Sequence, residues 1–294
     1  MEAVAVTGAN GFLGRRVVEA LRRRGASVRA VARSQEKAAS CAAPGVRPAV
    51  AELGDRGSLE GAFEGCGAVV SCAAFTSRHT GDLERFVEVN RAGTENVLRA
   101  AVAAGARRVV YLSTTAVYRT RLNRALAEDA PRLGEGFDWS WLVTDRRYAR
   151  SKALAEEHLW RCAAALDLEV VALRPGPIYG PGANRTAQAY RRALTRRIAF
   201  APTCRLPHVH VDDVASACAA AVEGPAGRAY NVSGPSVSPY EVLRILVRRQ
   251  GCGPRLVPVP LPLWVGYDDG AAARDLGFTA RPVAEGIADV LTDP

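Results

Sequence analysis

Val4-Ala5-Val6-Thr7-Gly8-Ala9-Asn10-Gly11-Phe12-Leu13-Gly14 is the stretch that decides the fold. A short apolar run meets three glycines in the spacing Gly-x-x-Gly-x-x-Gly, and a pattern typical of an amphipathic helix follows. A strand, a tight glycine turn and a helix together place a pyrophosphate at a helix N-terminus. Gly8 would permit the turn, Gly11 would let phosphate approach the backbone, and Gly14 would let the helix pack against the strand. The stretch therefore predicts a dinucleotide-binding site.

Length and composition set the broad class. The chain has 294 residues, 48% of them hydrophobic, so it can bury the core of one α/β unit with a smaller appended region. It has no run of about 18 apolar residues, which predicts that nothing spans a membrane. The N-terminus begins with a strand pattern and lacks the basic-then-apolar order of a signal peptide. We therefore expect a cytoplasmic protein.

The cysteines and histidines give no metal signature. Seven cysteines are scattered along the chain without a Cys-x-x-Cys pair, which is typical of reduced cytosolic thiols. The four histidines show no metal spacing with cysteine. His208 and His210 alternate along a predicted strand and so share a face, but alternation alone is weak evidence for a metal. We expect no metal site.

The net charge is +9, which raises the question of nucleic acid as a partner. The arginines are spread along the chain, and no nucleic-acid-binding motif accompanies them. We therefore expect an anionic cofactor and a small-molecule substrate, with neither nucleic acid nor membrane as a partner. Of the 39 Lys plus Arg residues, only Lys37 and Lys152 are lysines. Retention of lysine in so arginine-rich a chain indicates a need for a compact, titratable ammonium; retention by chance is the alternative.

Strand and helix patterns alternate through the first half of the chain. The predicted strands cover residues 4–6, 28–32, 46–51, 68–72, 108–112 and 168–173. Helical periodicity runs through the segment before Gly105, which ends that helix. This alternation predicts an α/β fold of the Rossmann type, a doubly wound parallel sheet with helices on both faces.

The composition changes after Arg174, where proline and glycine cluster up to Gly182. A basic helix pattern over 187–197 and a strand-to-helix pattern over 207–214 follow. We expect residues 1–174 to form the dinucleotide-binding domain, with 205–234 returning to it. Residues 175–204 and 235–294 would form a small substrate-binding lobe that closes over the cofactor.

Tyr148 and Lys152 stand four residues apart and would share one face of a helix. A phenol has a pKa near 10, and a neighbouring ammonium favours the phenolate and lowers that pKa. The pair would make a general acid/base, although a surface Tyr and Lys on one helix is the alternative. A hydroxyl cluster, Ser113-Thr114-Thr115, follows the strand over 108–112. One of these hydroxyls would hold a substrate oxygen while the others cap or bond the turn.

Together these motifs resemble the extended short-chain dehydrogenase/reductases, which are the NAD(P)-dependent epimerase/dehydratase-like proteins. The resemblance runs from Thr7 to about Leu291. Family branches with these motifs include 3β-hydroxysteroid dehydrogenase-like and dihydroflavonol reductase-like enzymes and reductases of β-keto acids or polyketide-type intermediates, and the sequence does not select among them. The pieces that carry it are residues 7–14, 89–97, 111–118, 148–152, 173–182 and 210–215.

The resemblance implies roles for matching positions. Tyr148 would be the acid/base, and Lys152 would lower its pKa and hold the nicotinamide ribose. Thr114 would be the catalytic hydroxyl, where serine is more usual, and Asn90 would support a proton relay, with local helix bonding as its alternative. The implied cofactor-binding positions are Gly8, Asn10, Gly11, Phe12, Leu13, Gly14, Glu52, Leu53, Cys72, Ala73, Ala74, Tyr148, Lys152, Pro175 and Ile178.

Cofactor choice depends on the end of the second predicted strand. An acid there usually bonds the ribose 2′-hydroxyl of NAD. This chain has no acid there and offers Arg33 and Ser34, with Lys37 one helical turn on. Arg33 would pair with a 2′-phosphate, so we expect NADP (NADPH), with NAD as the less favoured cofactor.

We expect reduction of a ketone to a secondary alcohol. A nucleotide-sugar epimerase that retains NAD is the second hypothesis, weakened because the segment before Asp212 lacks the Gly-x-Gly and arginine pattern of those enzymes. The catalytic Thr is not followed by an acid pair, which disfavours a dehydratase, and Arg119 stands where glycine is common. A non-catalytic NADP-sensing regulator is the third hypothesis. The family also implies a homodimer through the helices over 83–104 and 148–165, whose apolar content could equally face the monomer core.

Overall fold

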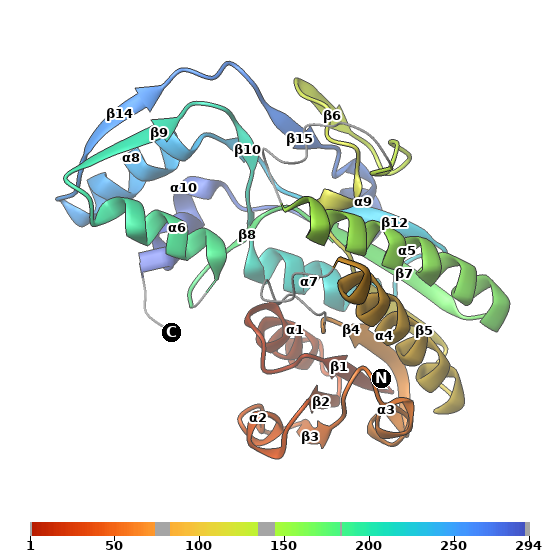
Figure 1. Cartoon of the computed structure of the whole chain (residues 1–294). Coiled ribbons are helices and arrows are strands. Elements are labelled where there is room, and N and C mark those ends of the chain that lie inside the picture. The colour runs from red at the N-terminus through yellow and green to blue at the C-terminus, as the bar shows by residue number, and fades with distance from the viewer. Residues whose placement is uncertain (1, 74–82, 135–144, 183, 292–294) are drawn as a thin grey trace.

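The computed structural model describes residues 2–73, 83–134, 145–182 and 184–291. Its centre is a parallel seven-stranded sheet with the strand order β12-β7-β5-β4-β1-β2-β3 (Figure 1). The strands are β1 (Ala3–Thr7), β2 (Val28–Ala32), β3 (Val46–Val50), β4 (Cys66–Ser71), β5 (Arg108–Leu112), β7 (Glu169–Pro175) and β12 (Arg228–Val232). The predicted doubly wound α/β fold is confirmed.

Helices cover both faces of this sheet (Figure 1). Side chains alternate across a strand, so Val4 and Val6 enter one core cluster while Ala5 enters the other. The helices that contribute to the first cluster are α1 (Phe12–Arg23), α7 (Val211–Ala221) and α9 (Gly270–Leu276). Those that contribute to the second are α3 (Arg56–Phe63), α4 (Leu83–Ala103) and α5 (Arg146–Leu166). The short helix α2 (Gln35–Ala39) follows β2.

The chain order reverses between β1 and β4, which are neighbours in the sheet. In doubly wound sheets, ligands bind in the crevice at the carboxyl ends of the strands next to such a reversal. The glycine loop follows β1 directly, and Ser113-Thr114-Thr115 follows β5. The fold therefore brings the two predicted site motifs to the same edge of the sheet.

A smaller lobe stands at one side of the molecule, away from β1, β2 and β3 (Figure 1). Tyr190, Leu246 and Ile287 belong to its own apolar cluster, which is separate from those of the sheet. Its main elements are α6 (Arg185–Leu194), β9 (Ile198–Pro202), α8 (Pro239–Gln250), β14 (Arg255–Val259), α10 (Val283–Gly286) and a 3-10 turn (Ile287–Leu291). Short pairs join β8 (Ile178–Tyr179) to β11 (Val209–His210), and β10 (Leu206–Pro207) to β13 (Ser236–Val237).

The prediction assigned all of residues 235–294 to the small lobe, but part of this range packs with the sheet. Ala271 and Ala272 of α9 lie in the core cluster of the sheet, and α9 packs on β12. Small side chains allow this helix to approach the strand closely. Further, β15 (Val265–Tyr267) pairs with β6 (Arg124–Leu126), which follows the hydroxyl cluster. The C-terminal segment is thus shared between both regions.

Local capping sets helix ends that apolar periodicity did not place. Helix α5 begins at Arg146, two residues before Tyr148, because the Asp145 carboxylate accepts a hydrogen bond from the Arg147 amide. Helix α6 begins at Arg185 because Asn184 caps it. In the described ranges, no helix combines the length and apolar character needed to cross a bilayer.

Candidate active site

The glycine loop turns sharply between β1 and α1. Gly8 has a φ of +66°, a left-handed conformation that favours glycine, and its carbonyl oxygen accepts a 2.9 Å hydrogen bond from the Gly11 amide. A Cβ added at Gly14 would lie 2.1 Å from that same carbonyl oxygen. Glycine at position 14 is therefore required for α1 to pack against the turn.

The N-terminus of α1 is open for an anion. Gly11 is its N-cap residue, no side chain caps its first amides, and no acidic residue lies in its first turn. The Arg15 side chain instead bonds the Asn10 carbonyl oxygen at 3.1 Å. Leu13 packs against the core and so fixes the helix on the sheet. Uncapped amides and the positive end of the helix dipole fit a pyrophosphate.

The end of β2 presents basic groups. Arg33 follows the last residue of the strand and is exposed, and Lys37 is half-buried in α2. Neither side chain has a hydrogen bond or ion pair within the described ranges. Ser34 has a structural role, because it caps α2. Its Oγ accepts a 3.4 Å hydrogen bond from the Lys37 amide. Arg33 and Lys37 are thus the groups here that a phosphate would meet.

The other predicted cofactor positions line the same edge. Leu53 follows β3, and its carbonyl oxygen accepts a 2.9 Å hydrogen bond from Asn96 of α4, while the side chain of Glu52 is exposed. Cys72 and Ala73 follow β4, and the Ala73 amide donates to Thr7 Oγ1 at 3.2 Å. Burial raises the pKa of the Cys72 thiol to about 12.

Two further positions come from the segment that leaves the sheet. Pro175 ends β7, and Ile178 lies in β8, packed against the core cluster beneath the crevice. Ala74 lies outside the described residues. The positions that are described therefore follow β1, β2, β3, β4 and β7 at one edge.

The predicted acid/base group is assembled at the end of β5. The side chain of Thr114 lies near enough to Tyr148 to lower the pKa of the phenol, and Lys152 lies one helical turn further along α5. Thr114 also caps the following 3-10 turn (Thr115–Val117), accepting a 3.2 Å bond from the Ala116 amide. Of the three hydroxyl residues of the cluster, Thr114 is the one in contact with Tyr148, and it takes the capping role as well.

The pKa of Tyr148 departs from the sequence expectation. Burial raises it above its usual value, while Lys152 and the side chain of Thr114 lower it by less. The expected lowering by Lys152 is therefore present, but burial outweighs it, so the prediction of a lowered pKa is wrong. Desolvation of a buried phenolate outweighs the attraction of one ammonium.

Lys152 is buried and held by the strand beneath it. Its Nζ donates to the Tyr111 hydroxyl at 3.0 Å and to the Leu112 carbonyl oxygen at 2.7 Å. Burial alone would lower the pKa of Lys152, but the oxygens of Tyr111 and Tyr148 outweigh it and raise that pKa. Lys152 therefore stays charged inside the protein.

Asn90 lies next to this group but bonds another residue. Its Nδ2 donates a 2.9 Å hydrogen bond to Ser151 Oγ, and its backbone carbonyl oxygen accepts from Thr94 Oγ1 at 2.8 Å. Both Asn90 and Ser151 are buried. Asn90 thus ties α4 to α5 at the residue before Lys152, while its expected role in a proton relay stays a prediction.

Two residues of this region were not singled out from the sequence. Tyr111 precedes the hydroxyl cluster by two residues on β5 and therefore faces α5, where it meets Lys152. Glu156 follows Lys152 by four residues, shares its face of α5, and hydrogen-bonds Ser113. Their spacing from recognised positions was the available signal.

A buried polar network extends from Glu156 to the edge of the sheet. The Arg174 guanidinium of β7 bonds both Glu156 carboxylate oxygens, and its Nη1 donates to the Tyr118 hydroxyl at 2.6 Å. Tyr118 in turn donates to Asn231 of β12 at 2.6 Å. Burial alone would raise the pKa of Glu156, but Arg174 and Ser113 lower it. The network fixes α5 relative to β7 and β12.

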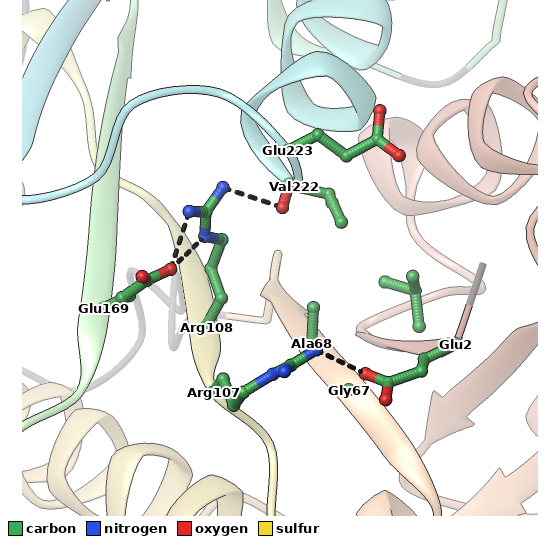
Figure 2. A pocket seen from close by; sticks show the side chains of 9 residues that line it. Glu2, Gly67, Ala68, Arg107, Arg108, Glu169, Val222 and Glu223 are labelled. Atoms are coloured by element: carbon green, nitrogen blue, oxygen red, sulfur yellow. Dashed lines mark hydrogen bonds and ion pairs between the residues drawn. The ribbon is translucent and has the colours of Figure 1, made fainter.

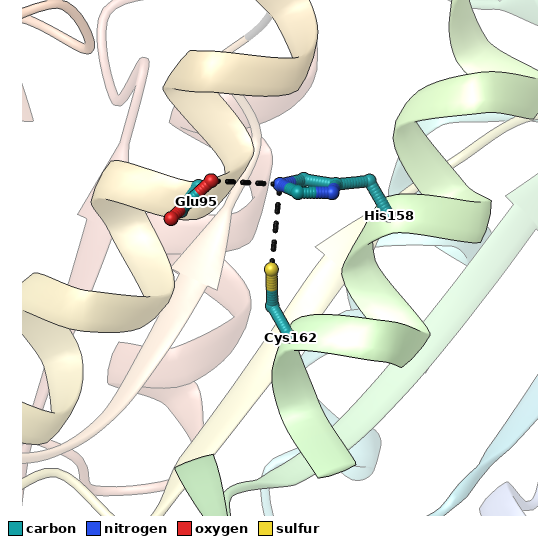
Figure 3. A group of neighbouring side chains, drawn as sticks. All are labelled: Glu95, His158 and Cys162. Atoms are coloured by element: carbon teal, nitrogen blue, oxygen red, sulfur yellow. Dashed lines mark hydrogen bonds and ion pairs between the residues drawn. The ribbon is translucent and has the colours of Figure 1, made fainter. Parts of the chain in front are cut away.

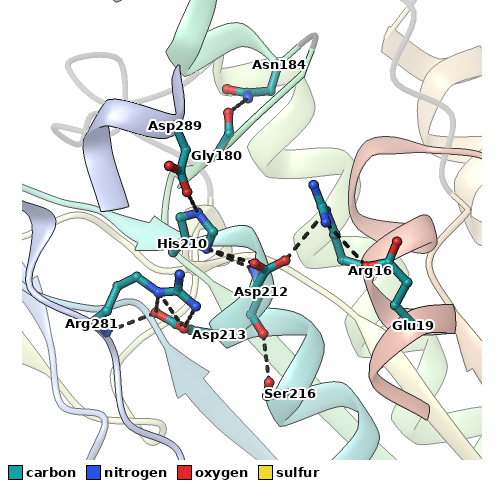
Figure 4. A network of polar contacts seen from close by, with 10 residues as sticks. All are labelled: Arg16, Glu19, Gly180, Asn184, His210, Asp212, Asp213, Ser216, Arg281 and Asp289. Atoms are coloured by element: carbon teal, nitrogen blue, oxygen red, sulfur yellow. Dashed lines mark hydrogen bonds and ion pairs between the residues drawn. The ribbon is translucent and has the colours of Figure 1, made fainter. Parts of the chain in front are cut away.

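His208 and His210 are each engaged separately. His208 Nε2 is 2.8 Å from the Tyr190 hydroxyl, and its Nδ1 is 2.8 Å from the Leu206 carbonyl oxygen. His210 Nδ1 accepts from the Asp212 amide, and its Nε2 contacts Asp289 at 3.1 Å (Figure 4). The two imidazoles therefore serve different local networks.

A pocket of about 590 Å³ opens at the other edge of the sheet, beside the amino ends of β1, β4 and β5. Four of its charged residues form two pairs, Arg107 with Glu2 at 3.1 Å and Arg108 with Glu169 at 2.6 Å (Figure 2). It lies at the opposite edge of the sheet from Tyr148 and Lys152. The glycine cradle and the uncapped helix, in contrast, fit a dinucleotide.

Comparison with known proteins agrees with this geometry. Residues 4–233 match the family described as the NAD dependent epimerase/dehydratase family. The chain is 34% identical over 282 residues to a 4-hydroxy-2-methyl-3-oxo-4-farnesyl-3,4-dihydroquinoline-1-oxide ketoreductase of Stigmatella aurantiaca, covering 92% of this chain and 78% of that protein. It is 32% identical over 255 residues to sterol demethylase protein B of Methylococcus capsulatus, covering 84% and 74%.

The fold is also similar to a solved UDP-glucose 4-epimerase of Thermus thermophilus in complex with NAD. The TM-score is 0.80 at 25% identity, and the match covers 98% of this chain and 97% of that one. Reductases and epimerases thus both occur among the similar proteins.

Proposed function

The chain belongs to the NAD-dependent epimerase/dehydratase family of extended short-chain dehydrogenase/reductases and is an NAD(P)-dependent oxidoreductase, and from this premise we propose that it is an NADPH-dependent ketoreductase. The observation that carries the proposal is the contact between Tyr148 and Thr114 beside the charged, buried Lys152. The substrate would be the ketone of a small molecule other than a nucleotide sugar.

The residues divide the chemistry of such a reduction. When bound, the nicotinamide supplies the hydride that the ketone carbon gains. Tyr148 gives its proton to the ketone oxygen, and Thr114 donates a hydrogen bond to that oxygen as negative charge develops. Tyr148 is left as a phenolate, which the Lys152 ammonium stabilises until a proton from solvent replaces the one transferred.

The preference for NADPH rests on Arg33 and Lys37. An exposed guanidinium directly after β2, with an ammonium one turn on, suits a doubly charged 2′-phosphate. No carboxylate follows β2 to bond a ribose 2′-hydroxyl, since Arg33, Ser34 and Gln35 occupy those positions. The 2′-phosphate of NADP therefore has partners here that NAD would leave unused.

Titration of NADPH and NADH by nicotinamide fluorescence tests this proposal. Loss of a charge-assisted hydrogen bond costs about 1.5–3 kcal/mol, so Arg33→Ala should weaken NADPH binding about 10- to 100-fold and leave NADH binding unchanged. Arg47→Ala is the matched control, because Arg47 is an exposed arginine at the start of β3. Equal affinity of the wild-type protein for the two cofactors would contradict the NADPH assignment.

Two other functions remain as outcomes of the same experiments. NAD that stays bound through purification is expected for an epimerase. Such a result would favour an activity like that of the Thermus thermophilus epimerase over one like that of the Stigmatella aurantiaca ketoreductase. A Tyr148→Phe variant that retains every cellular function would favour a non-catalytic sensor of NADP. Screening ketones with the wild-type protein and Tyr148→Phe separates both from a ketoreductase.

We also propose a cytoplasmic homodimer that forms through α4 and α5. Three large apolar side chains are exposed on these helices, namely Val89, Val102 and Leu154. Light scattering of Leu154→Arg tests this arrangement, with Leu261→Arg in the lobe as a control at an equally exposed leucine. A monomer in the wild-type protein would contradict it.

A further inference from the structure

Three side chains with metal-binding atoms converge on the seam between α4 and α5. Glu95 comes from α4, and His158 and Cys162 come from α5, one helical turn apart (Figure 3). His158 Nε2 is 2.9 Å from Glu95 Oε2 and 3.3 Å from Cys162 Sγ. The three donor atoms all lie within 4.8 Å of one another. This cluster lies outside the residues assigned to catalysis or cofactor binding.

The protons available do not satisfy this arrangement well. Both the carboxylate and the sulfur approach the same ring nitrogen of His158, as Figure 3 shows. A protonated Nε2 donates one hydrogen, which the carboxylate and the sulfur must share. A bare Nε2 accepts from the thiol but then faces the carboxylate lone pairs at 2.9 Å. Three Lewis-basic atoms around one point are better satisfied by a cation.

The donor set fits one ion in particular. Imidazole nitrogen, thiolate sulfur and carboxylate oxygen are the ligands of Zn²⁺, with bonds of about 2.0–2.3 Å in tetrahedral sites. Such bonds place neighbouring donors about 3.3–3.7 Å apart, so His158 Nε2 needs to move only a few tenths of an ångström away from the carboxylate and the sulfur. Hard cations such as Mg²⁺ would not use the sulfur.

We propose that Glu95, His158 and Cys162 form a Zn²⁺ site that clamps α4 to α5, with water in the fourth position. The side chain of Glu95 is 30% exposed, which leaves that side of the site open to solvent. His158 is almost buried, and the residues beside it in the core, Leu98 and Leu159, fix the two helices. The site is structural, and it stands independently of the proposed ketoreductase activity.

Charge sets the conditions for binding. A carboxylate and a thiolate balance the two charges of Zn²⁺, while Arg99, which pairs with Glu95 at 2.8 Å, must give up part of that contact. Arg91 and Arg161 also lie near the sulfur and oppose a cation. Zn²⁺ binds the thiolate, so the proton of the Cys162 thiol must be displaced on binding. Zn²⁺ affinity should therefore increase with pH, with release of a proton.

Titration of the chelator-treated, full-length protein with ZnCl₂ against a chromophoric competitor tests the site. The expected result is one Zn²⁺ per chain. Glu95→Gln, His158→Gln and Cys162→Ser should each weaken binding by more than about 100-fold, the upper range for losing a residue that merely supports a ligand. Cys252→Ser is the control, because Cys252 is an exposed thiol in the loop between α8 and β14.

Two further measurements distinguish the loss of a metal ligand from a folding defect in a variant. Circular dichroism establishes that each variant is folded before it is titrated. Co²⁺ in place of Zn²⁺ should give a thiolate charge-transfer band that is lost in Cys162→Ser and retained in Cys252→Ser. No saturable binding by the wild-type protein, or binding that persists in folded Cys162→Ser and Glu95→Gln, would overturn the proposal.

Discussion

The Nζ atom of Lys152 lies 3.0 Å from the hydroxyl oxygen of Tyr111, which is a residue of β5, whereas Lys152 belongs to α5. The ammonium also lies over the Tyr111 ring, 4.4 Å from its centroid. Tyr111 therefore holds Lys152 by two kinds of contact, one polar and one with the face of the ring. Residues of β5 thus position Lys152.

Tyr111→Phe separates these two contacts, since it removes the hydroxyl and keeps the ring. One hydrogen bond to a charged group is lost, so we expect about a tenfold decrease in kcat for ketone reduction. We expect Lys152→Met to lower kcat considerably more than Tyr111→Phe does. Steady-state kinetics of both variants checks this, with circular dichroism to establish folding. If Tyr111→Phe has the same kinetics as the wild-type protein, the Tyr111 hydroxyl contributes to packing alone.

The raised pKa of Tyr148 predicts opposite pH profiles for the two reaction directions. Ketone reduction needs the protonated phenol, which is the form present below its pKa, so kcat/KM should stay flat from about pH 6 to 9. Alcohol oxidation needs the phenolate, so its kcat/KM should increase with pH over the same range. Burial is the main cause of the shift. A reductive rate that falls already between about pH 7 and 8 would contradict this assignment.

Gly14→Ala should disrupt the cofactor loop. The new Cβ would lie 2.1 Å from the Gly8 carbonyl oxygen, which is backbone and cannot turn aside. We expect loss of NADPH binding and a decrease of about 1–3 kcal/mol in the free energy of unfolding. Fluorescence titration and urea denaturation measure the two effects.

Gly61→Ala is the matched control for that change. Gly61 lies in α3 with nothing within 4 Å of an added Cβ, so alanine should stabilise the helix by up to about 1 kcal/mol. Equal NADPH affinity in Gly14→Ala and Gly61→Ala would mean that the loop does not hold the cofactor.

Glu156→Gln should be strongly destabilising, because it leaves the buried Arg174 guanidinium without its counter-charge. Breaking a buried pair in this way costs about 3–5 kcal/mol, measured by urea denaturation. Glu157→Gln is the control at the next residue. The Glu157–Arg161 pair is exposed on both sides, so we expect a change within about 0.5 kcal/mol.

The same carboxylate makes stability depend on pH. The pKa of Glu156 is lowered in the folded protein, so its contribution is complete above the unfolded value of about 4.3 and is lost as pH falls through the folded value. Wild-type protein should therefore lose more stability between about pH 5 and 3 than Glu156→Gln does. If the free energies of unfolding of the two proteins change in parallel over this pH range, the result would contradict the pairing of Glu156 with Arg174.

Most of the sheet could be predicted because each of its first six strands is a short apolar run between turn residues. β12 was not predicted as a strand, since its place beside β7 depends on a contact between segments far apart in the sequence. The pKa of Tyr148 depends mainly on its burial in the folded protein, which the spacing of residues in the sequence does not report. The donors Glu95 and His158 meet across two helices, 63 residues apart, so the sequence indicated no metal spacing although His158 and Cys162 stand four apart.

The position of β12 at the edge of the sheet has a consequence for synthesis. The sheet can be completed only after the late segment that forms β12 has been translated. Arg174 and Tyr118 are translated early, whereas Asn231, the residue that receives the Tyr118 hydroxyl, follows only after the chain has passed through α6 and β9. A nascent chain that ends after β9 therefore contains α5 but leaves the edge of β7 unpaired. The sheet is thus discontinuous in the chain, because its last strand is translated only after α6 and β9 of the lobe.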